Sequence, residues 1–224
     1  MPREGFADFC SAFSLTPTER AAFEAFDGHL TNVNAHTNLI ARSSSNERWS
    51  RHYADSAQLF DLIPADARTL LDVGSGAGFP GIVLAILAQT RRPDVAFTLC
   101  ESIQKKATFL REASQAAGLR NLNVQAVRVE TLPSSAKFDV ITARAVTSLD
   151  SLMGLAAPRL AGGGTMIFPK GRRAQVELDE ARKQWSFKFD RRASMTDPEA
   201  AILLIEDAKP THRAPVEGLR RAGG

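Results

Sequence analysis

Apolar residues in the first third of the chain recur at the spacing of helices. A capping box, Thr16-Pro-Thr-Glu19, begins the first predicted helix, because the Thr hydroxyl and the Glu carboxylate can each satisfy a backbone N–H that the first turn leaves free. Residues 34–45 are polar and predict a loop, and a further helix is predicted from Asn46 to about Leu62. The apolar stripe of the first helix comprises Phe23, Phe26, Leu30 and Val33.

From Thr69 onward, short apolar runs typical of buried strands alternate with helical segments. This alternation predicts an α/β fold with a mainly parallel, doubly wound sheet, and the last two strands are close enough in sequence to form an antiparallel edge. The three glycines at 162–164 are interpreted as the turn into a strand. The predicted strands are 69–73, 95–100, 122–127, 138–143, 165–168, 187–191 and 201–206. The predicted helices are 82–88, 102–118, 149–160 and 173–185.

The pattern divides the chain into three parts. Residues 1–64 are expected to form a helical extension packed on the core, and residues 65–208 the sheet domain. The tail at 209–224 is rich in Pro, Arg and Gly, so we expect it to be mobile.

Composition and charge exclude several classes of protein. Of the 224 residues, 44% are hydrophobic and 24% charged, as in folded soluble domains, and the net charge of +3 permits a nucleic-acid partner without requiring one. Cys10 and Cys100 lie far apart without metal-ligand spacing, so neither a disulfide framework nor a metal site is expected, and a cytoplasmic location is favoured. The continuous apolar run at 82–88 is much shorter than the roughly 20 residues of a membrane helix, and no membrane association is expected.

The most informative segment follows the first predicted strand, at Asp72-Val-Gly-Ser-Gly-Ala-Gly-Phe-Pro-Gly81. Glycines allow positive φ angles and let a ligand approach the backbone closely. The helix that begins near Pro80 presents free N–H groups, and ligands of parallel sheets bind where strands end. The segment therefore predicts a ligand site.

Two cofactors fit this loop. Gly76-Ala-Gly-Phe-Pro-Gly81 satisfies G-x-G-x-x-G, and Glu101 stands 20 residues further on, as in the dinucleotide fingerprint. Asp72 and Gly74 extend the pattern to D-x-G-x-G-x-G, the form seen in S-adenosylmethionine-dependent methyltransferases. A third interpretation is a loop whose glycines serve packing alone. The pattern favours S-adenosylmethionine over both alternatives.

Several separated motifs resemble one family, the bacterial methyltransferases of guanine N7 in small-subunit ribosomal RNA (the RsmG, or GidB, family). The resemblance covers most of the chain from about Asn34 to Gly171. The motifs are Asn38-Leu39, His52-Tyr-Ala-Asp55-Ser56, Asp72 to Gly81, Glu101-Ser-Ile-Gln-Lys-Lys-Ala-Thr-Phe-Leu110, Ala143-Arg144-Ala145 and Pro169-Lys170-Gly171. It implies a Rossmann-like class I methyltransferase fold with S-adenosylmethionine as the cofactor.

The resemblance also implies roles for individual residues. Arg144 would face the methionine end of the cofactor or the target base, and its place just after a predicted strand supports this, since a buried Arg needs a partner. Val129 and Glu130 would border the adenine, and they too follow a strand. The cofactor-binding residues so implied are Gly74, Gly76, Gly78, Phe79, Glu101, Val129, Glu130 and Arg144.

Basic residues supply candidate contacts to RNA phosphates, although scattered bases are usually a solvated surface. His52 and Asp55 lie three apart on one predicted helical face, where Asp55 could orient the imidazole or the pair could simply dock on the core. The RNA-binding candidates are Arg42, Arg48, Arg51, His52, Lys105, Lys106 and Lys170.

The resemblance implies methyl transfer to N7 of a guanine in a decoding-region loop of 16S ribosomal RNA, within the small ribosomal subunit or a precursor particle. N7 carries a lone pair and no proton, so the enzyme needs alignment of the reacting atoms rather than a general base. Two alternatives stay open: a methyltransferase acting on a small molecule or protein, and a nucleotide-binding regulatory module without turnover. Binding of S-adenosylmethionine or NAD, and labelling of rRNA, would separate them.

Overall fold

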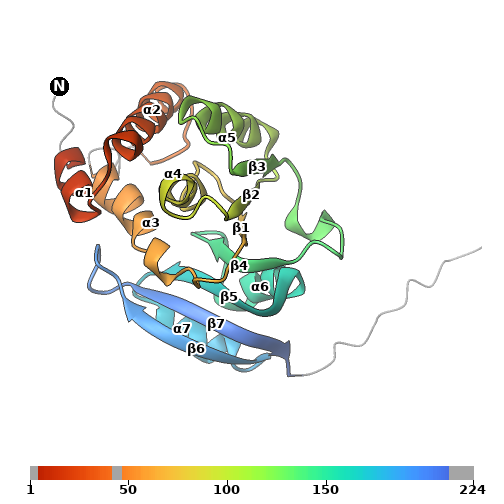
Figure 1. The fold of residues 1–224 in the computed structure, drawn as a ribbon. Coiled ribbons are helices and arrows are strands. Elements are labelled where there is room, and N and C mark those ends of the chain that lie inside the picture. Colours follow the sequence, from red (N-terminus) through yellow and green to blue (C-terminus); the bar gives the residue numbers. More distant parts are fainter. Residues whose placement is uncertain (1–4, 42–46, 212–224) are drawn as a thin grey trace, which may run out of the picture.

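The computed structural model describes residues 5–41 and 47–211 and contains a seven-stranded sheet in the order β3-β2-β1-β4-β5-β7-β6 (Figure 1). The first five strands of this order run parallel, whereas β7 is antiparallel to both of its neighbours. The predicted sheet and its antiparallel edge are therefore confirmed. The strands are β1 (Thr69–Val73), β2 (Ala96–Cys100), β3 (Leu122–Gln125), β4 (Phe138–Ala143), β5 (Leu160–Lys170), β6 (Trp185–Ala193) and β7 (Ala201–Pro210).

The strand order reverses between β1 and β4. From β1 the chain proceeds outward through β2 to β3, then returns to pair β4 with the other side of β1, with Val73 opposite Ala143. Ligands of doubly wound sheets bind in the crevice outside the carboxyl ends of strands at such a reversal. The segments that follow β1 and β4 therefore lie on the two sides of this crevice.

Helices cover both faces of the sheet (Figure 1). On one face α4 (Gly81–Arg91) is buried from Gly81 to Ala88, because it lies between the sheet and the covering helix α2 (Pro17–Asn34). The helix α5 (Gln104–Ala116) lies on the same face and packs against α2 and β3. The opposite face carries α6 (Leu149–Ala156) and α7 (Ala174–Ala181). No helix within the described ranges is both long and apolar enough to cross a membrane.

The segment before β1 packs on the α4 side through aromatic side chains. It comprises α1 (Phe6–Ala12), α2, a π-helix η2 (Trp49–Ala54), the short α3 (Asp55–Ala57) and a 3-10 turn η3 (Phe60–Leu62). Trp49 stacks on Tyr53 at 4.0 Å between ring centroids, and Phe9 contacts both rings. The predicted capping box of α2 is present, with Thr16 and Glu19 bonded reciprocally.

Several predicted boundaries are wrong. The described part of the helix predicted at 46–62 is a succession of π, α and 3-10 turns, with Trp49 and Tyr53 both buried in the aromatic core. The glycines at 162–164 lie inside β5, where a register shift against β4 and the φ of +80° at Gly163 form a bulge instead of a turn. The last predicted helix ends at Ala181, and Trp185 already begins β6.

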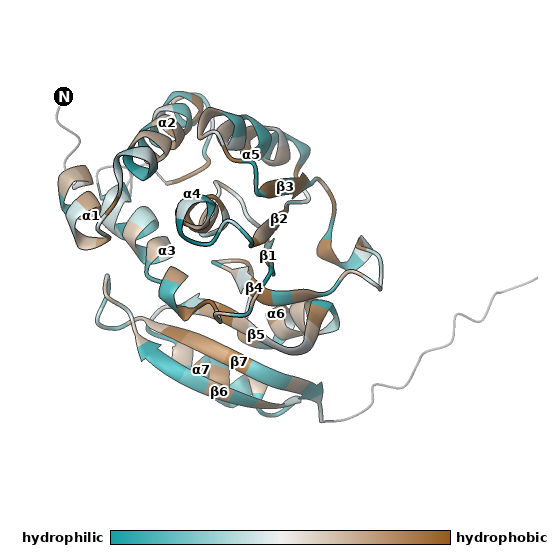
Figure 2. Cartoon of the chain, in the orientation of Figure 1, coloured by the Kyte–Doolittle hydropathy of each residue, from teal (hydrophilic) through white to brown (hydrophobic). Residues whose placement is uncertain are grey.

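The strands β6 and β7 are longer than predicted, since each satisfies its backbone groups on the other. β7 includes Lys209 and Pro210, which the sequence pattern places in a mobile tail; residues 212–224 lie outside the described residues, as do 42–46. In Figure 2 β7 is hydrophobic along its first half while β6 is more hydrophilic, in keeping with the inner and edge positions of the two strands.

Glu19 ties the N-terminal helices to α4. Its buried carboxylate accepts hydrogen bonds from Thr90 Oγ1 at 2.6 Å, Arg91 Nε at 2.7 Å and the Thr16 amide at 2.8 Å. Burial by itself raises the pKa of Glu19, but these hydrogen bonds, that of Arg91 first, outweigh it and lower the pKa from 4.5 to about 2. The charged form is therefore part of the folded structure.

We expect Glu19→Gln to lower the free energy of unfolding at pH 7 by roughly 2–3 kcal/mol, because a folded-state pKa below the unfolded one stabilises the fold above the unfolded value. The difference between the two proteins should shrink as the pH falls from 4.5 towards 2, where wild-type Glu19 becomes protonated. Urea unfolding across this pH range measures it. Asp8→Asn, at an exposed acid of α1, is the control, and equal losses in both variants would contradict the assignment.

Candidate active site

The glycine loop after β1 forms one wall of the crevice. Gly74, Gly76 and Gly78 have φ angles of +66°, +55° and +90°, in the left-handed region that favours glycine. A Cβ on Gly78 would lie 2.7 Å from Ile82 Cδ1, so this glycine is required by packing. A Cβ on Gly76 would meet only the Gly74 carbonyl, at 3.7 Å, so the backbone at Gly76 faces open space that a ligand can enter.

Glu101, directly after β2, holds this loop. Its Oε2 accepts a hydrogen bond from the Gly76 amide at 3.0 Å, and its Oε1 accepts one from the Ile103 amide at 2.8 Å. Glu101 is buried, with 5% of the residue exposed. The structure thus brings together the glycines and the acid that the sequence singled out, although they are 25 residues apart.

Asp72 lies beneath the loop and is fully buried. Its Oδ1 accepts a hydrogen bond from Thr142 Oγ1 at 2.8 Å, whereas Oδ2 has no partner of normal geometry among the described residues. Burial raises the pKa of Asp72 to about 6 against the hydrogen bonds that lower it. Oδ2 is 2.7 Å from where a Cβ of Gly81 would stand, which explains why the acid and the last glycine of the motif occur together.

Val129 and Glu130 lie in a 3-10 turn, η4 (Val129–Thr131), after β3. Val129 is buried, while the Glu130 side chain is exposed and its carbonyl accepts a hydrogen bond from Arg159 at 3.0 Å. Both follow the strand next to β2, as predicted, and so lie at the same edge of the sheet as Glu101.

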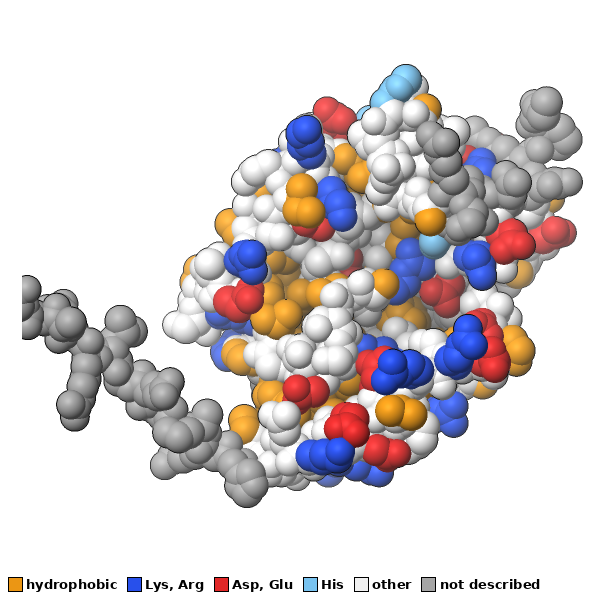
Figure 3. Space-filling model, turned by 180° about the vertical axis from the view of Figure 1, so that it is seen from behind, with side chains coloured by type: hydrophobic (Ala, Val, Ile, Leu, Met, Phe, Trp, Pro, Cys, Tyr) orange, Lys and Arg blue, Asp and Glu red, His pale blue; other side chains and the backbone are white. Residues whose placement is uncertain are grey.

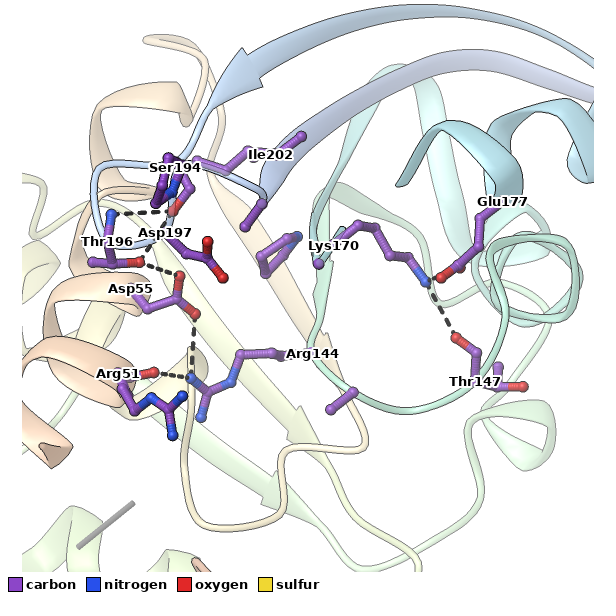
Figure 4. A pocket seen from close by; sticks show the side chains of 16 residues that line it. Arg51, Asp55, Arg144, Thr147, Lys170, Glu177, Ser194, Thr196, Asp197 and Ile202 are labelled. Atoms are coloured by element: carbon purple, nitrogen blue, oxygen red, sulfur yellow. Dashed lines mark hydrogen bonds and ion pairs between the residues drawn. The ribbon is translucent and has the colours of Figure 1, made fainter. Parts of the chain in front are cut away.

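Arg144, directly after β4, is bonded to the N-terminal helical segment. Its Nη1 donates to the Arg51 carbonyl at 3.1 Å and to Asp55 Oδ2 at 3.3 Å (Figure 4). Its Nη2 lies 3.2 Å from His52 Nδ1. The guanidinium also lies over the ring of Phe79, 5.1 Å from its centroid. The spacing of His52 and Asp55 therefore presents both side chains to the same Arg.

Phe79 is enclosed by these groups. It is 3% exposed and contacts Phe26, His52 and Tyr53 in addition to Arg144. The Phe79 ring therefore packs against the Arg144 guanidinium, and only the backbone of Phe79 contributes to the glycine loop.

His52 is kept neutral. Burial, with smaller contributions from the positive charges of Arg144 and Arg51, lowers its pKa to about 4. Arg144 is a donor, so Nδ1 acts as the acceptor and the ring hydrogen resides on Nε2.

Arg144 also lines a cavity of about 630 Å³, whose lining residues do not include the glycine loop (Figure 4). At the opposite wall Lys170, at the end of β5, donates to Glu177 Oε2 at 2.9 Å and to the Thr147 carbonyl at 3.2 Å. Glu177 also accepts from the Leu149 amide, so it fixes the segment between β4 and α6. The cavity is further lined by Arg51, Asp55, Ser194, Thr196 and Asp197.

Sequence reasoning missed the contribution of residues 194–197 and of Glu177. No motif marks them, and they reach the cavity only because β7 pairs with β5, placing Ala201 opposite Lys170. The one signal in the sequence was the closeness of the last two predicted strands. When these strands pair antiparallel beside β5, their connecting loop lies near the carboxyl end of β5.

The RNA-binding candidates are dispersed. Arg48 is held by Asp27, with Nε 2.6 Å from Oδ1, and Lys170 is enclosed by its partners. Arg51 has a side chain 59% exposed at the rim of the cavity. Lys105 and Lys106 lie in the first turn of α5, and Arg42 lies outside the described residues. In Figure 3 basic and acidic side chains are interspersed over the face shown.

The described residues contain no group of three or more His, Cys, Asp or Glu side chains arranged to hold a metal ion.

Solved structures that share this fold include methyltransferases. An O-methyltransferase from Bacillus cereus in complex with SAH matches with a TM-score of 0.53 at 14% identity, covering 80% of this chain and 90% of that one. A putative O-methyltransferase from Klebsiella pneumoniae matches with a TM-score of 0.54 at 13% identity, covering 85% and 90%. The sheet order, the glycine loop and the acid after β2 define a class I, S-adenosylmethionine-dependent methyltransferase.

Within this class, residues 19–202 match the family described as rRNA small subunit methyltransferase G (GidB), and the chain belongs to that family. A ribosomal RNA small subunit methyltransferase G from Ruegeria sp. (strain TM1040) is 43% identical over 181 residues, covering 81% of this chain and 87% of the relative. One from Cereibacter sphaeroides (strain ATCC 17025) is 47% identical over 173 residues, covering 77% and 82%. The resemblance and the cofactor predicted from sequence are confirmed.

An NMR titration of the His52 imidazole should give a midpoint near pH 4, and Arg144→Met should raise it, because one of the two positive charges that oppose protonation is removed. Since the unfolded histidine takes up its proton near pH 6.5, this group stabilises the fold fully above 6.5 and loses that contribution as the pH falls towards 4. The His52→Asn spectrum assigns the resonance. A midpoint of 6.5 or higher in the wild type would contradict the Arg144 contact.

Proposed function

We propose that this protein methylates N7 of a guanine in the decoding-region loop of 16S ribosomal RNA, acting in the cytoplasm on the small ribosomal subunit or a precursor of it. Its membership of the rRNA small subunit methyltransferase G family supports the choice of RNA. The observation that carries the proposal is the position of Arg144, between the glycine-loop crevice and a cavity of suitable volume for a nucleotide.

The residues of the glycine-loop side fit the cofactor. Gly76 leaves open space above its backbone, and Glu101 fixes the loop from below. We assign Gly74, Gly76, Gly78, Glu101, Val129 and Glu130 to this half of the site, with Phe79 supporting Arg144. S-adenosylmethionine, when bound, supplies the methyl group.

The residues of the cavity side fit a base that has been taken out of its stack. N7 of guanine has no proton to lose, which agrees with a site whose histidine is neutral and bonded to Arg144. Guanine presents O6 beside N7 as a hydrogen-bond acceptor. The Nε–H of Arg144 has no partner in the part of the chain that the structure describes, so Arg144 can donate to O6 while leaving N7 accessible.

Burial lowers the pKa of the Arg144 guanidinium, while the neighbouring Asp55 favours its charged form. The three contacts to Arg51, Asp55 and His52 keep the side chain in one orientation before RNA arrives. A donor oriented in advance needs no rearrangement as the reaction proceeds. We therefore assign Arg144 to orienting the target base.

A small number of basic side chains would contact the remainder of the RNA. Lys105 on α5 is exposed and Lys106 beside it is half-buried. Arg51 at the cavity rim is exposed and pairs with the exposed Glu47, whereas Arg48 is engaged with the buried Asp27. Lys170 and His52 would act within the site. A small number of phosphate contacts suits recognition of a loop by shape and unstacked bases.

The direct test is to incubate the protein with labelled S-adenosylmethionine and undermethylated small subunits, and to map the modified nucleotide by primer extension after cleavage at 7-methylguanine. One labelled guanine in the decoding-region loop is expected. Cofactor binding with label only in protein or small molecules would overturn the RNA assignment. Absence of S-adenosylmethionine binding would favour a regulatory module.

Arg144→Ala should raise the activation free energy of single-turnover methylation by about 2–4 kcal/mol, because an aligned charged donor disappears. Arg144→Lys should restore little of the rate, since an ammonium lacks the planar fork of the guanidinium. Arg51→Ala is the comparison at the rim of the same cavity and should change mainly the salt dependence of RNA binding. A wild-type single-turnover rate in Arg144→Ala would contradict the role.

Gly76→Val should abolish S-adenosylmethionine binding, because the new side chain occupies the open space and resists the φ of +55°. Gly118→Val is a matched control: its φ is +68°, nothing lies within 4 Å of a Cβ there, and it ends α5 away from the crevice. Calorimetry should show loss of affinity only in the first variant, with comparable destabilisation in thermal unfolding. Affinity within about threefold of wild type in Gly76→Val would overturn the pocket assignment.

A further inference from the structure

Three carboxylates line the cavity beside Arg144, and two of them are engaged by cations. Asp55 pairs with Arg144, and Glu177 pairs with Lys170. The third, Asp197, belongs to the loop between β6 and β7. Its described hydrogen bond is to the Glu199 amide through Oδ1, at 2.9 Å, so Oδ2 remains available to a ligand. Figure 4 shows the Asp197 side chain directed into the cavity.

The loop that carries Asp197 is anchored to the α3 segment through Ser194, Met195 and Thr196. The Met195 amide donates to Gln58 Oε1 at 2.8 Å, and Gln58 Nε2 donates to Ser194 Oγ at 3.2 Å. Thr196 Oγ1 donates to Asp55 Oδ1 at 3.0 Å. The carboxylate of Asp55 therefore fixes Arg144 with one oxygen and the 194–197 loop with the other, which sets Asp197 and Arg144 in a defined relation.

Guanine suits a cavity with a donor at one wall and a carboxylate at another. Its N7 and O6 form one edge, whereas N1–H and the 2-amino group are donors on the edge away from N7. A carboxylate accepts from both donors at once. Adenine has an acceptor at N1 and no 2-amino group, so the same carboxylate would repel it.

We propose that Asp197 is the specificity-determining residue of this site, accepting hydrogen bonds from N1–H and the 2-amino group of the target guanine while Arg144 contacts O6. This rests on the proposed function and adds to it the group that distinguishes guanine from other bases. Flipped bases are commonly recognised through this edge.

The test combines a protein variant with a substrate lacking one donor. Small subunits are reconstituted with 16S rRNA carrying either guanosine or inosine at the mapped nucleotide; inosine lacks only the 2-amino group. For wild type, inosine should lower kcat/KM roughly 10- to 100-fold, as expected for loss of a hydrogen bond to a charged acceptor. Without cofactor, the wild-type protein should also bind the inosine subunits more weakly than the guanosine subunits.

Asp197→Asn should remove or reverse this preference, because the Asn amide can keep the Glu199 contact but places its NH₂ opposite a guanine donor. Glu199→Gln, an exposed acid in the same loop, should keep the wild-type ratio of guanosine to inosine rates. Equal wild-type rates on the two substrates, or an unchanged ratio in Asp197→Asn, would overturn the proposal. Failure of wild type to methylate the guanosine subunits would instead overturn the proposed function.

Discussion

The Asp55 carboxylate joins three parts of the molecule that are distant in sequence. One oxygen receives Arg144 from the end of β4, and the other receives Thr196 from the β6–β7 loop, while its own backbone belongs to the helical segment before β1. Both side chains of the Asp55–Arg144 pair are 18% exposed, so solvent screens the interaction only in part. Orientation of Arg144 and closure of the cavity therefore depend on the same contact.

Burial shifts the pKa values of two titratable groups in the site. The pKa of His52 falls to about 4 and that of Asp72 rises to about 6, and in each case burial is the largest cause. Both changes disfavour charge close to Arg144, where one fixed positive group is needed. A methyl acceptor without a proton makes no demand for a general base, so a neutral His52 bonded to Arg144 is compatible with the chemistry.

The two halves of the site lie on the two sides of the reversal in strand order between β1 and β4. The glycine loop, Glu101 and the η4 turn follow the carboxyl ends of β1, β2 and β3, and we assign them to the cofactor half. The ends of β4 and β5, with the beginning of β7, form the cavity half. The reversal of strand order between β1 and β4 brings the two halves together, and Arg144 stands at their boundary.

The sequence by itself determined the local features whose signals are short-ranged: strands β1 and β4 to the residue, the capping box at Thr16, and the glycine loop with its following acid. Its motifs also indicated the family and Arg144. Only the tertiary structure decided that Gly162–Gly164 form a bulge, that Arg48 is held by Asp27, and that Asp197 enters the cavity. These outcomes depend on strand pairing and on partners far along the chain, and the spacing of residues close together in the sequence does not indicate either.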